Sequence, residues 1–174
     1  LTKKKIIFNF RQNDIENGGE GAPLSPIFHQ LIVNKHKISL PTCILNIGGI
    51  SNVTIINEPK ETYSFTSRDI GPGNCLIDSW VRKNSKYKYD EDGIFASSGK
   101  RNEIIFEQAQ ELFANRPNQN KISFDTNDFD VSFARGLSLE DGAATLTDIT
   151  ARIIGSALFS ILTNIRDKSL KVIV

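Results

Sequence analysis

Dense apolar runs of strand type dominate the part of the chain that follows residue 41. Residues 43–49 and 51–57 form two such runs joined by glycines, and residues 62–71 form a third. Short β-branched runs that meet at a glycine turn are typical of a hairpin. The pattern therefore predicts two strands joined by a hairpin, followed by a third strand.

Other segments repeat their apolar residues every three or four positions, which predicts helices with one buried face. The predicted helices cover residues 24–32, 76–81, 102–114 and 139–163. Ser138 and Asp141 predict a capping box at the start of the last helix.

Three remaining segments complete the expected architecture. Residues 5–10 are predicted to form a short strand, residues 82–100 an exposed polar insertion, and residues 170–174 a buried parallel strand. Hairpin-linked strands followed by a crossover helix indicate an α/β protein with a mixed sheet covered by helices. Residues 1–40 are expected to end a preceding domain.

Composition narrows the class of protein without identifying it. The 174 residues are 39% hydrophobic and 24% charged, with a formal net charge of +1. This is a globular composition that gives no electrostatic reason to expect nucleic acid or a membrane as a partner. The two cysteines and two histidines are not clustered, so no metal site is expected from them, and reduced thiols favour the cytoplasm. The chain begins with Leu1 and contains no methionine, so we expect it to be a piece of a longer protein.

The glycine turn between the first two strands is the first candidate for chemistry. Asn46, Gly48, Gly49 and Asn52 lie in or beside it. Glycines let backbone N–H groups approach a ligand closely, and a concave row of such groups binds phosphate oxygens. An ordinary hairpin turn also explains two glycines, so both interpretations stand.

A second candidate lies where the third strand gives way to a helix, at residues 69–74. A carboxylate at a strand end, beside a helix N-terminus, can act as a general base, and Asp69 occupies that position. The alternative is that Asp69 only caps the helix. Asp78, on the helix itself, is an alternative acid.

A third glycine loop, residues 18–21, precedes the first predicted helix. It lacks the GK[ST] that would follow in a P-loop. Arg11 and Asp14, just before it, either line a polar cleft or form a solvated surface pair.

These blocks, in this order, resemble the anhydro-N-acetylmuramic acid kinase family over nearly the whole chain. The matching blocks are NFRQNDIENGGEGAPLSPIFH, LNIGGISNVTII, DIGPGNCLIDSW and LSLEDGAATLTDITARIIG. The resemblance implies an actin-like, hexokinase-type (ribonuclease H-like) fold with two lobes flanking a cleft. It also implies an enzyme that uses ATP, Mg²⁺ and water to open a 1,6-anhydro amino sugar and phosphorylate its O6. The product would be N-acetylmuramic acid 6-phosphate, for cell-wall recycling in the cytoplasm.

The resemblance assigns roles to residues by motif. Asp69 would be the catalytic base that activates water, and Asn46, Gly48, Gly49 and Asn52 would lie at the ATP phosphates. The expected sugar-binding residues are Gly71 and Asn74, with Arg11, Asp14, Gly18, Gly19 and Gly21 approaching from the other lobe.

The resemblance also implies a partial chain. Residues 1–40 would end the first lobe, and residues 41–174 would form most of the second lobe without its C-terminal nucleotide-binding segment. Asn9 stands where the family has aspartate. We expect the chain alone to be inactive, with an unfinished sheet edge that favours a homodimer. The alternatives are a degenerate, non-catalytic relative that acts as a binding module, and another kinase of the same fold class.

Overall fold

The computed structural model describes residues 4–19, 21–57, 64–114, 123–164 and 170–174. Its centre is a mixed sheet with the strand order β3-β2-β1-β4. The strands are β1 (Thr42–Ile47), β2 (Ile50–Ile56), β3 (Phe65–Pro72) and β4 (Lys171–Ile173). β2 pairs antiparallel with both β1 and β3, whereas β4 pairs parallel with β1. The predicted hairpin, third strand and parallel last strand are confirmed.

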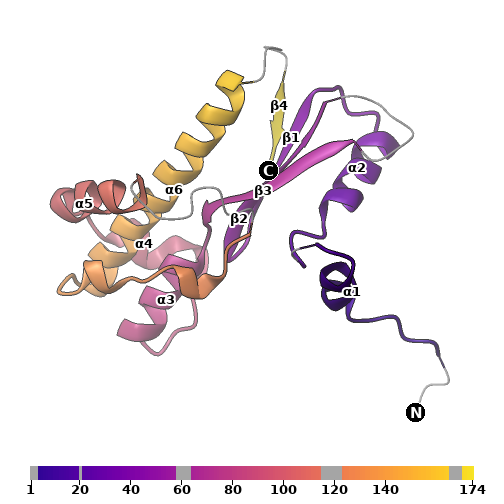
Figure 1. Ribbon diagram of the computed structural model, residues 1–174. Helices are drawn as coiled ribbons and strands as arrows, with labels where there is room; N and C mark the ends of the chain where they lie inside the picture. The colour runs from indigo at the N-terminus through magenta and orange to yellow at the C-terminus, as the bar shows by residue number, and fades with distance from the viewer. Residues whose placement is uncertain (1–3, 20, 58–63, 115–122, 165–169) are drawn as a thin grey trace.

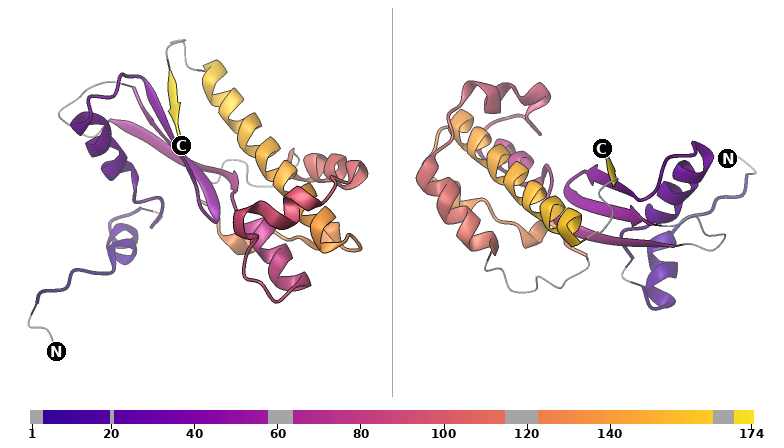
Figure 2. Two further views of the ribbon diagram at one scale, coloured as in Figure 1. Left: turned by 180° about the vertical axis from the view of Figure 1, so that it is seen from behind. Right: turned by 90° about the horizontal axis from the view of Figure 1, so that it is seen from above.

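Helices cover both faces of this sheet (Figure 1). They are α1 (Phe10–Glu16), α2 (Pro26–Lys35), α3 (Cys75–Asn84), α4 (Ile94–Ser98), α5 (Glu103–Ala114) and α6 (Leu139–Asn164). Short 3-10 turns occur at Glu91–Gly93, Thr126–Asp128 and Ser132–Ala134. Figure 2 shows α2 on one side of the sheet and α6, with α3 and α5, on the other.

Two expectations about individual segments are wrong. Residues 4–9 form no regular structure, because Ile6, Ile7 and Phe8 are largely exposed and no described strand pairs with them. β4 is parallel as predicted but exposed, because it forms an edge of the sheet. The segment 82–100 is largely exposed, as predicted, and it also contains α4, whose Phe95 and Ala96 pack against the core.

The main core lies between α3, α5 and α6, where the apolar stripes of these helices meet. Leu76, Leu146 and Ile149 are fully buried there. Trp80 packs against Gly142 at the start of α6 and donates a hydrogen bond from Nε1 to the Leu139 carbonyl at 2.9 Å. A second cluster joins the sheet to the later turns of α6, through residues such as Cys43, Val53 and Ile154.

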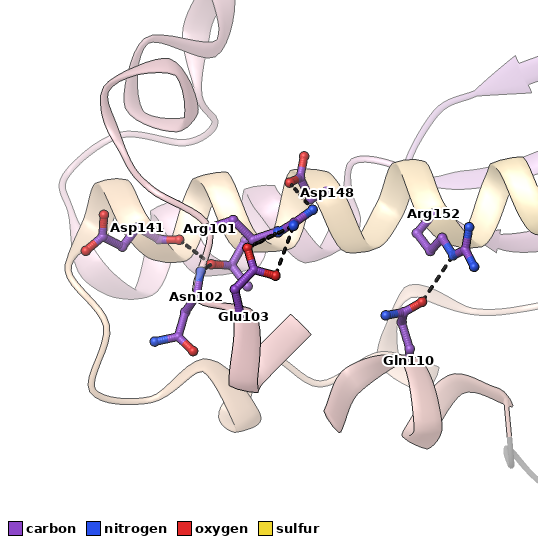
Figure 3. A network of polar contacts seen from close by, with 8 residues as sticks. Arg101, Asn102, Glu103, Gln110, Asp141, Asp148 and Arg152 are labelled. Carbon is purple, nitrogen blue, oxygen red and sulfur yellow. Dashed lines mark hydrogen bonds and ion pairs between the residues drawn. The ribbon is translucent and has the colours of Figure 1, made fainter. Parts of the chain in front are cut away.

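The position of α6 depends on polar contacts as well as on packing (Figure 3). Arg101 lies between Glu103 and Asp148, at 2.8 and 3.2 Å. Ser138 Oγ accepts from the Asp141 N–H, but the Asp141 carboxylate accepts from the Lys100 N–H instead of closing the predicted capping box. The start of α6 is thereby fixed to the connection between α4 and α5.

By length and composition alone, α6 is apolar enough to cross a membrane. The core helix of a soluble protein passes the same test. Since α3, α4, α5 and β3 all pack against α6, we interpret it as a core helix.

Candidate active site

Two glycine motifs that are distant in the sequence meet at the end of the sheet. The carbonyl of Gly48 accepts from the Asn74 N–H at 2.7 Å, and the carbonyl of Gly49 accepts from the Gly73 and Cys75 N–H groups at 2.9 and 3.2 Å. A Cβ at position 73 would overlap the Gly48 carbonyl oxygen, so glycine is required for this approach. The hairpin carbonyls therefore accept the N–H groups of Gly73 and Asn74, which precede α3, and of Cys75, its first residue.

Three polar residues, one from each antiparallel strand, lie in one row across the sheet. Asn46 of β1 pairs with Asn52 of β2, and Asn52 pairs with Asp69 of β3. Directly opposite residues in antiparallel strands have Cβ atoms only about 4.5–5.5 Å apart. The structure thus brings together two of the residues expected at the ATP phosphates and the expected catalytic base.

A bulge in β3 produces the second of these pairings. Ser51 pairs with Gly71, but Asn52 pairs with Asp69, so Ile70 is an extra residue in β3. Bulges re-aim side chains and are common beside active sites. Here the bulge determines which residue of β3 faces Asn52.

The Asp69 carboxylate is nearly buried and is held from outside the sheet. Its exposed fraction is 9%, and Oδ2 accepts from the Phe124 backbone N–H at 2.7 Å. A hydrogen bond of this kind restricts the orientation of the carboxylate. The sequence analysis assigned no role to Phe124, which lies in the segment between the helices predicted at 102–114 and 139–163. The aromatic residues Phe124 and Phe129 within that segment were the available signal.

A cavity of about 370 Å³ opens beside Asp69. Its lining is largely apolar and comes from β3, α5, α6 and the segment around Phe124. Gly71 is part of this lining, with φ of +153°, and a Cβ there would lie 2.6 Å from Ile153 Cγ2. Asn74, the other residue expected at the sugar, is exposed at the start of α3 and does not line this cavity.

Asp78 lies in a different cavity, of about 540 Å³, with Gly49, Arg82 and Lys83. Burial raises the pKa of Asp78, and the nearby Arg82 partly opposes that effect. Because Asp78 does not line the cavity beside Asp69, it is not part of the same cluster.

The glycine loop after α1 forms a unit of its own. The Asp14 carboxylate accepts from the Gly21 N–H at 2.8 Å, and the Asp14 carbonyl accepts from the Gly19 N–H at 2.8 Å. A Cβ at Gly19 would overlap the Asp14 carboxylate, while Gly18 and Gly21 have positive φ. Asp14 therefore organises this loop.

The structure does not bring α1, with Arg11 and Asp14, to Asp69. In Figures 1 and 2, α1 lies beyond α2, apart from α3, α5 and α6.

A mixed sheet with helices on both faces, and a glycine hairpin bonded to the helix after the third strand, agree with the sugar kinase and actin-like ATPase fold class, to which the matching family belongs. A family model for anhydro-N-acetylmuramic acid kinase matches residues 1–173. The chain therefore belongs to the anhydro-N-acetylmuramic acid kinase family.

Individual relatives agree with this assignment. The anhydro-N-acetylmuramic acid kinase of Pelagibacter ubique (strain HTCC1062) is 50% identical over 174 residues, which are 100% of this chain and 46% of that kinase. The kinase of the same name from Zymomonas mobilis (strain ATCC 31821) is 38% identical over 159 residues, covering 90% of this chain and 42% of the relative. The chain thus spans less than half the length of these relatives.

Proposed function

We propose that this chain supplies the catalytic base and part of the nucleotide site of a kinase that phosphorylates 1,6-anhydro-N-acetylmuramic acid with ATP. The observation that supports the proposal best is the row Asn46, Asn52 and Asp69, beside the Gly48–Gly49 turn. It puts a nearly buried carboxylate next to the residues expected at the phosphates. The proposal is also supported by the 50% identity of this chain to the anhydro-N-acetylmuramic acid kinase of Pelagibacter ubique.

In the proposed reaction, Asp69 removes a proton from a water molecule as the water oxygen attacks the anomeric carbon. The bond from that carbon to O6 breaks, and O6 attacks the γ-phosphorus of ATP. The bond from phosphorus to the bridging oxygen breaks, and ADP leaves. Asp69 then releases the proton to solvent and is regenerated. Water supplies the new anomeric hydroxyl, and ATP supplies the phosphoryl group. The product is N-acetylmuramic acid 6-phosphate, an intermediate suited to cell-wall recycling in the cytoplasm.

The environment of Asp69 suits this role. An aspartate with 9% exposure is shielded from bulk solvent, and its hydrogen bond from Phe124 fixes one carboxylate oxygen. Positioned general bases contribute about 10²–10⁴-fold to rates. The adjacent, largely apolar cavity of about 370 Å³ is of a size to receive a sugar ring.

The residues at the hairpin fit a nucleotide phosphate. Gly49 is exposed at the turn, and its N–H has no acceptor within the described part of the chain. Among the described residues no three histidine, cysteine, aspartate or glutamate side chains gather as a metal site. We propose Mg²⁺ because ATP-dependent phosphoryl transfer uses this ion, which is usually held by one or two carboxylates, water and the phosphate oxygens themselves. When bound, Mg²⁺ neutralises charge on the phosphoryl group.

Because the chain spans less than half the length of its relatives, we propose that other segments of the full-length enzyme take part in the activity. We propose ATP and the anhydro sugar as the ligands of the full-length protein. We also propose that the full-length protein forms a homodimer. The division into the end of one lobe (residues 1–40) and most of another (residues 41–174) stays a prediction. In the structure, α2 packs against β2 and β3.

A chimera tests the proposal. Residues 1–174 replace the matching segment of the Pelagibacter kinase, and ATP-dependent phosphorylation of anhydro-N-acetylmuramic acid is measured beside the parent enzyme. We expect activity in the chimera and none in the isolated chain. A chimera that folds like its parent but does not phosphorylate the sugar would contradict the proposal, and would favour a non-catalytic binding module.

A further inference from the structure

Among the described residues, the wall of the cavity beside Asp69 contains one cationic residue, Arg68. Arg68 is exposed, so a ligand in the cavity can reach it. Within the described part of the chain, its guanidinium forms no ion pair with a carboxylate. A guanidinium is always charged in proteins and carries hydrogen-bond donors only. This group is therefore suited to bind an anion.

The position of β3 explains why Arg68 and Asp69 line the same cavity. Successive side chains of a strand point to opposite faces of a sheet. Residues 68–72 of β3 nevertheless all line this cavity, and β3 is an edge of the described sheet. A cavity at a sheet edge is open to residues from both faces of the strand. An anion that Arg68 binds there lies in the same cavity as the proposed catalytic base.

The lining of the cavity favours the sugar over ATP as the source of this anion. The four residues expected at the ATP phosphates do not line it, and one of them, Gly49, lines the cavity that contains Asp78. Anhydro-N-acetylmuramic acid carries a lactyl group on O3, and the carboxylate of that group is ionised at neutral pH. Since C3 and the anomeric carbon belong to one ring, a sugar that reacts beside Asp69 brings this carboxylate into the same cavity.

We propose that Arg68 is a specificity-determining residue, which binds the lactyl carboxylate of the sugar; this extends the function proposed above and rests on it. The guanidinium donates two parallel N–H bonds to the two carboxylate oxygens, an arrangement that a neutral group cannot match. Ligand cavities are typically apolar, with a few polar groups that give specificity. Arg68 thus selects the acidic anhydro sugar over a neutral one with the same ring.

This role affects binding of the sugar and not the chemical step. The lactyl carboxylate keeps its charge throughout the reaction, so a contact to it stabilises the substrate and the transition state equally. Losing such a contact raises KM for the sugar at an unchanged kcat. Because Arg68 is an exposed residue, its substitution should leave Tm unchanged.

The test compares Arg68→Gln with Arg135→Gln in the chimera. Arg135 is exposed and does not line the cavity, so its substitution removes the same charge elsewhere on the surface. The substrate is anhydro-N-acetylmuramic acid, and its neutral primary amide serves as a competitive inhibitor. For Arg68→Gln we expect KM for the acid to rise about ten-fold. We expect kcat, KM for ATP and Ki of the amide to stay within about two-fold of the unsubstituted chimera.

Two further variants complete the comparison. Arg68→Lys keeps the charge but loses the paired donors, so we expect KM for the acid to rise by only about three-fold. For Arg135→Gln we expect no change in any of these constants.

Three results would overturn the assignment of Arg68: an unchanged KM for the acid in Arg68→Gln, an equal rise in KM for the acid and Ki of the amide, or a raised KM for ATP at an unchanged KM for the acid. An unsubstituted chimera that is folded but inactive would instead contradict the function proposed above, and the role of Arg68 with it. The two failures are thus told apart by the unsubstituted chimera.

Discussion

Two glycines of α6 differ in what surrounds them, and this difference predicts opposite effects of the same substitution. A Cβ at Gly142 would overlap the indole of Trp80, whereas a Cβ at Gly155 would meet nothing within 4 Å. We therefore predict that Gly142→Ala destabilises the protein and that Gly155→Ala stabilises it.

The magnitudes follow from the contacts. Replacing glycine by alanine inside a helix gains about 0.8–1.0 kcal/mol, and Gly155→Ala should show this gain undiminished. At Gly142 the gain is opposed by overpacking, which costs about 1–3 kcal/mol. Trp80 is 4% exposed and bonds the Leu139 carbonyl, so moving its ring would cost about another 1 kcal/mol. The two variants should differ by about 2–4 kcal/mol.

The assay is urea unfolding followed by fluorescence, since Trp80 is the one tryptophan of the chain and lies at the perturbed contact. The free energies of unfolding in water are compared between the two variants. The comparison requires that the slope of the free energy against urea concentration is the same in both. A Gly142→Ala variant as stable as Gly155→Ala would refute the packing of α3 on α6 described here.

Two further predictions concern pH. Burial lowers the pKa of His29, whose Nδ1 lies 2.8 Å from Thr54 Oγ1. As the pH falls below about 6.5, His29 binds a proton in the unfolded chain before it does so in the folded chain. The free energy of unfolding therefore decreases in this pH range. The Tm difference between about pH 7.5 and about pH 5.5 should shrink in His29→Gln, and an unchanged difference would contradict this reasoning. Burial also raises the pKa of the Cys43 and Cys75 thiols, so stability should fall as the pH rises above about 8.5, where unfolded thiols ionise first. Iodoacetamide should label the folded chain more slowly than the urea-unfolded chain at about pH 9, and equal rates would count against buried thiols.

The sequence predicted the parts of the site that depend on local pattern. The glycine turn defined the hairpin, and the change from strand to helix period predicted Asp69 at a strand end, although β3 continues to Pro72. It did not predict that Asp69 pairs with Asn52, because the pairing depends on the extra residue Ile70 in β3. Nor did it predict the hydrogen bond from Phe124, which is 55 residues away along the chain.

The failed strand prediction has a similar physical cause. Residues 6–8 have the apolar composition of a strand, but a strand forms only where another strand supplies hydrogen bonds. The described part of the chain offers no such partner, and these side chains stay exposed. Local pattern therefore predicted most elements, while pairing and contacts over long sequence distances needed the structure.

Replacement of Asp69 tests the central claim most directly. In the chimera with the Pelagibacter kinase, Asp69→Asn is compared with Asp92→Asn, which makes the same chemical change at an exposed residue with positive φ, a conformation that asparagine tolerates. We predict that Asp69→Asn lowers kcat by about 10³-fold, as expected for a positioned general base, and that Asp92→Asn retains the activity of the chimera. An Asp69→Asn chimera that is folded and phosphorylates the sugar at the unsubstituted rate would contradict the assignment of Asp69 as the catalytic base.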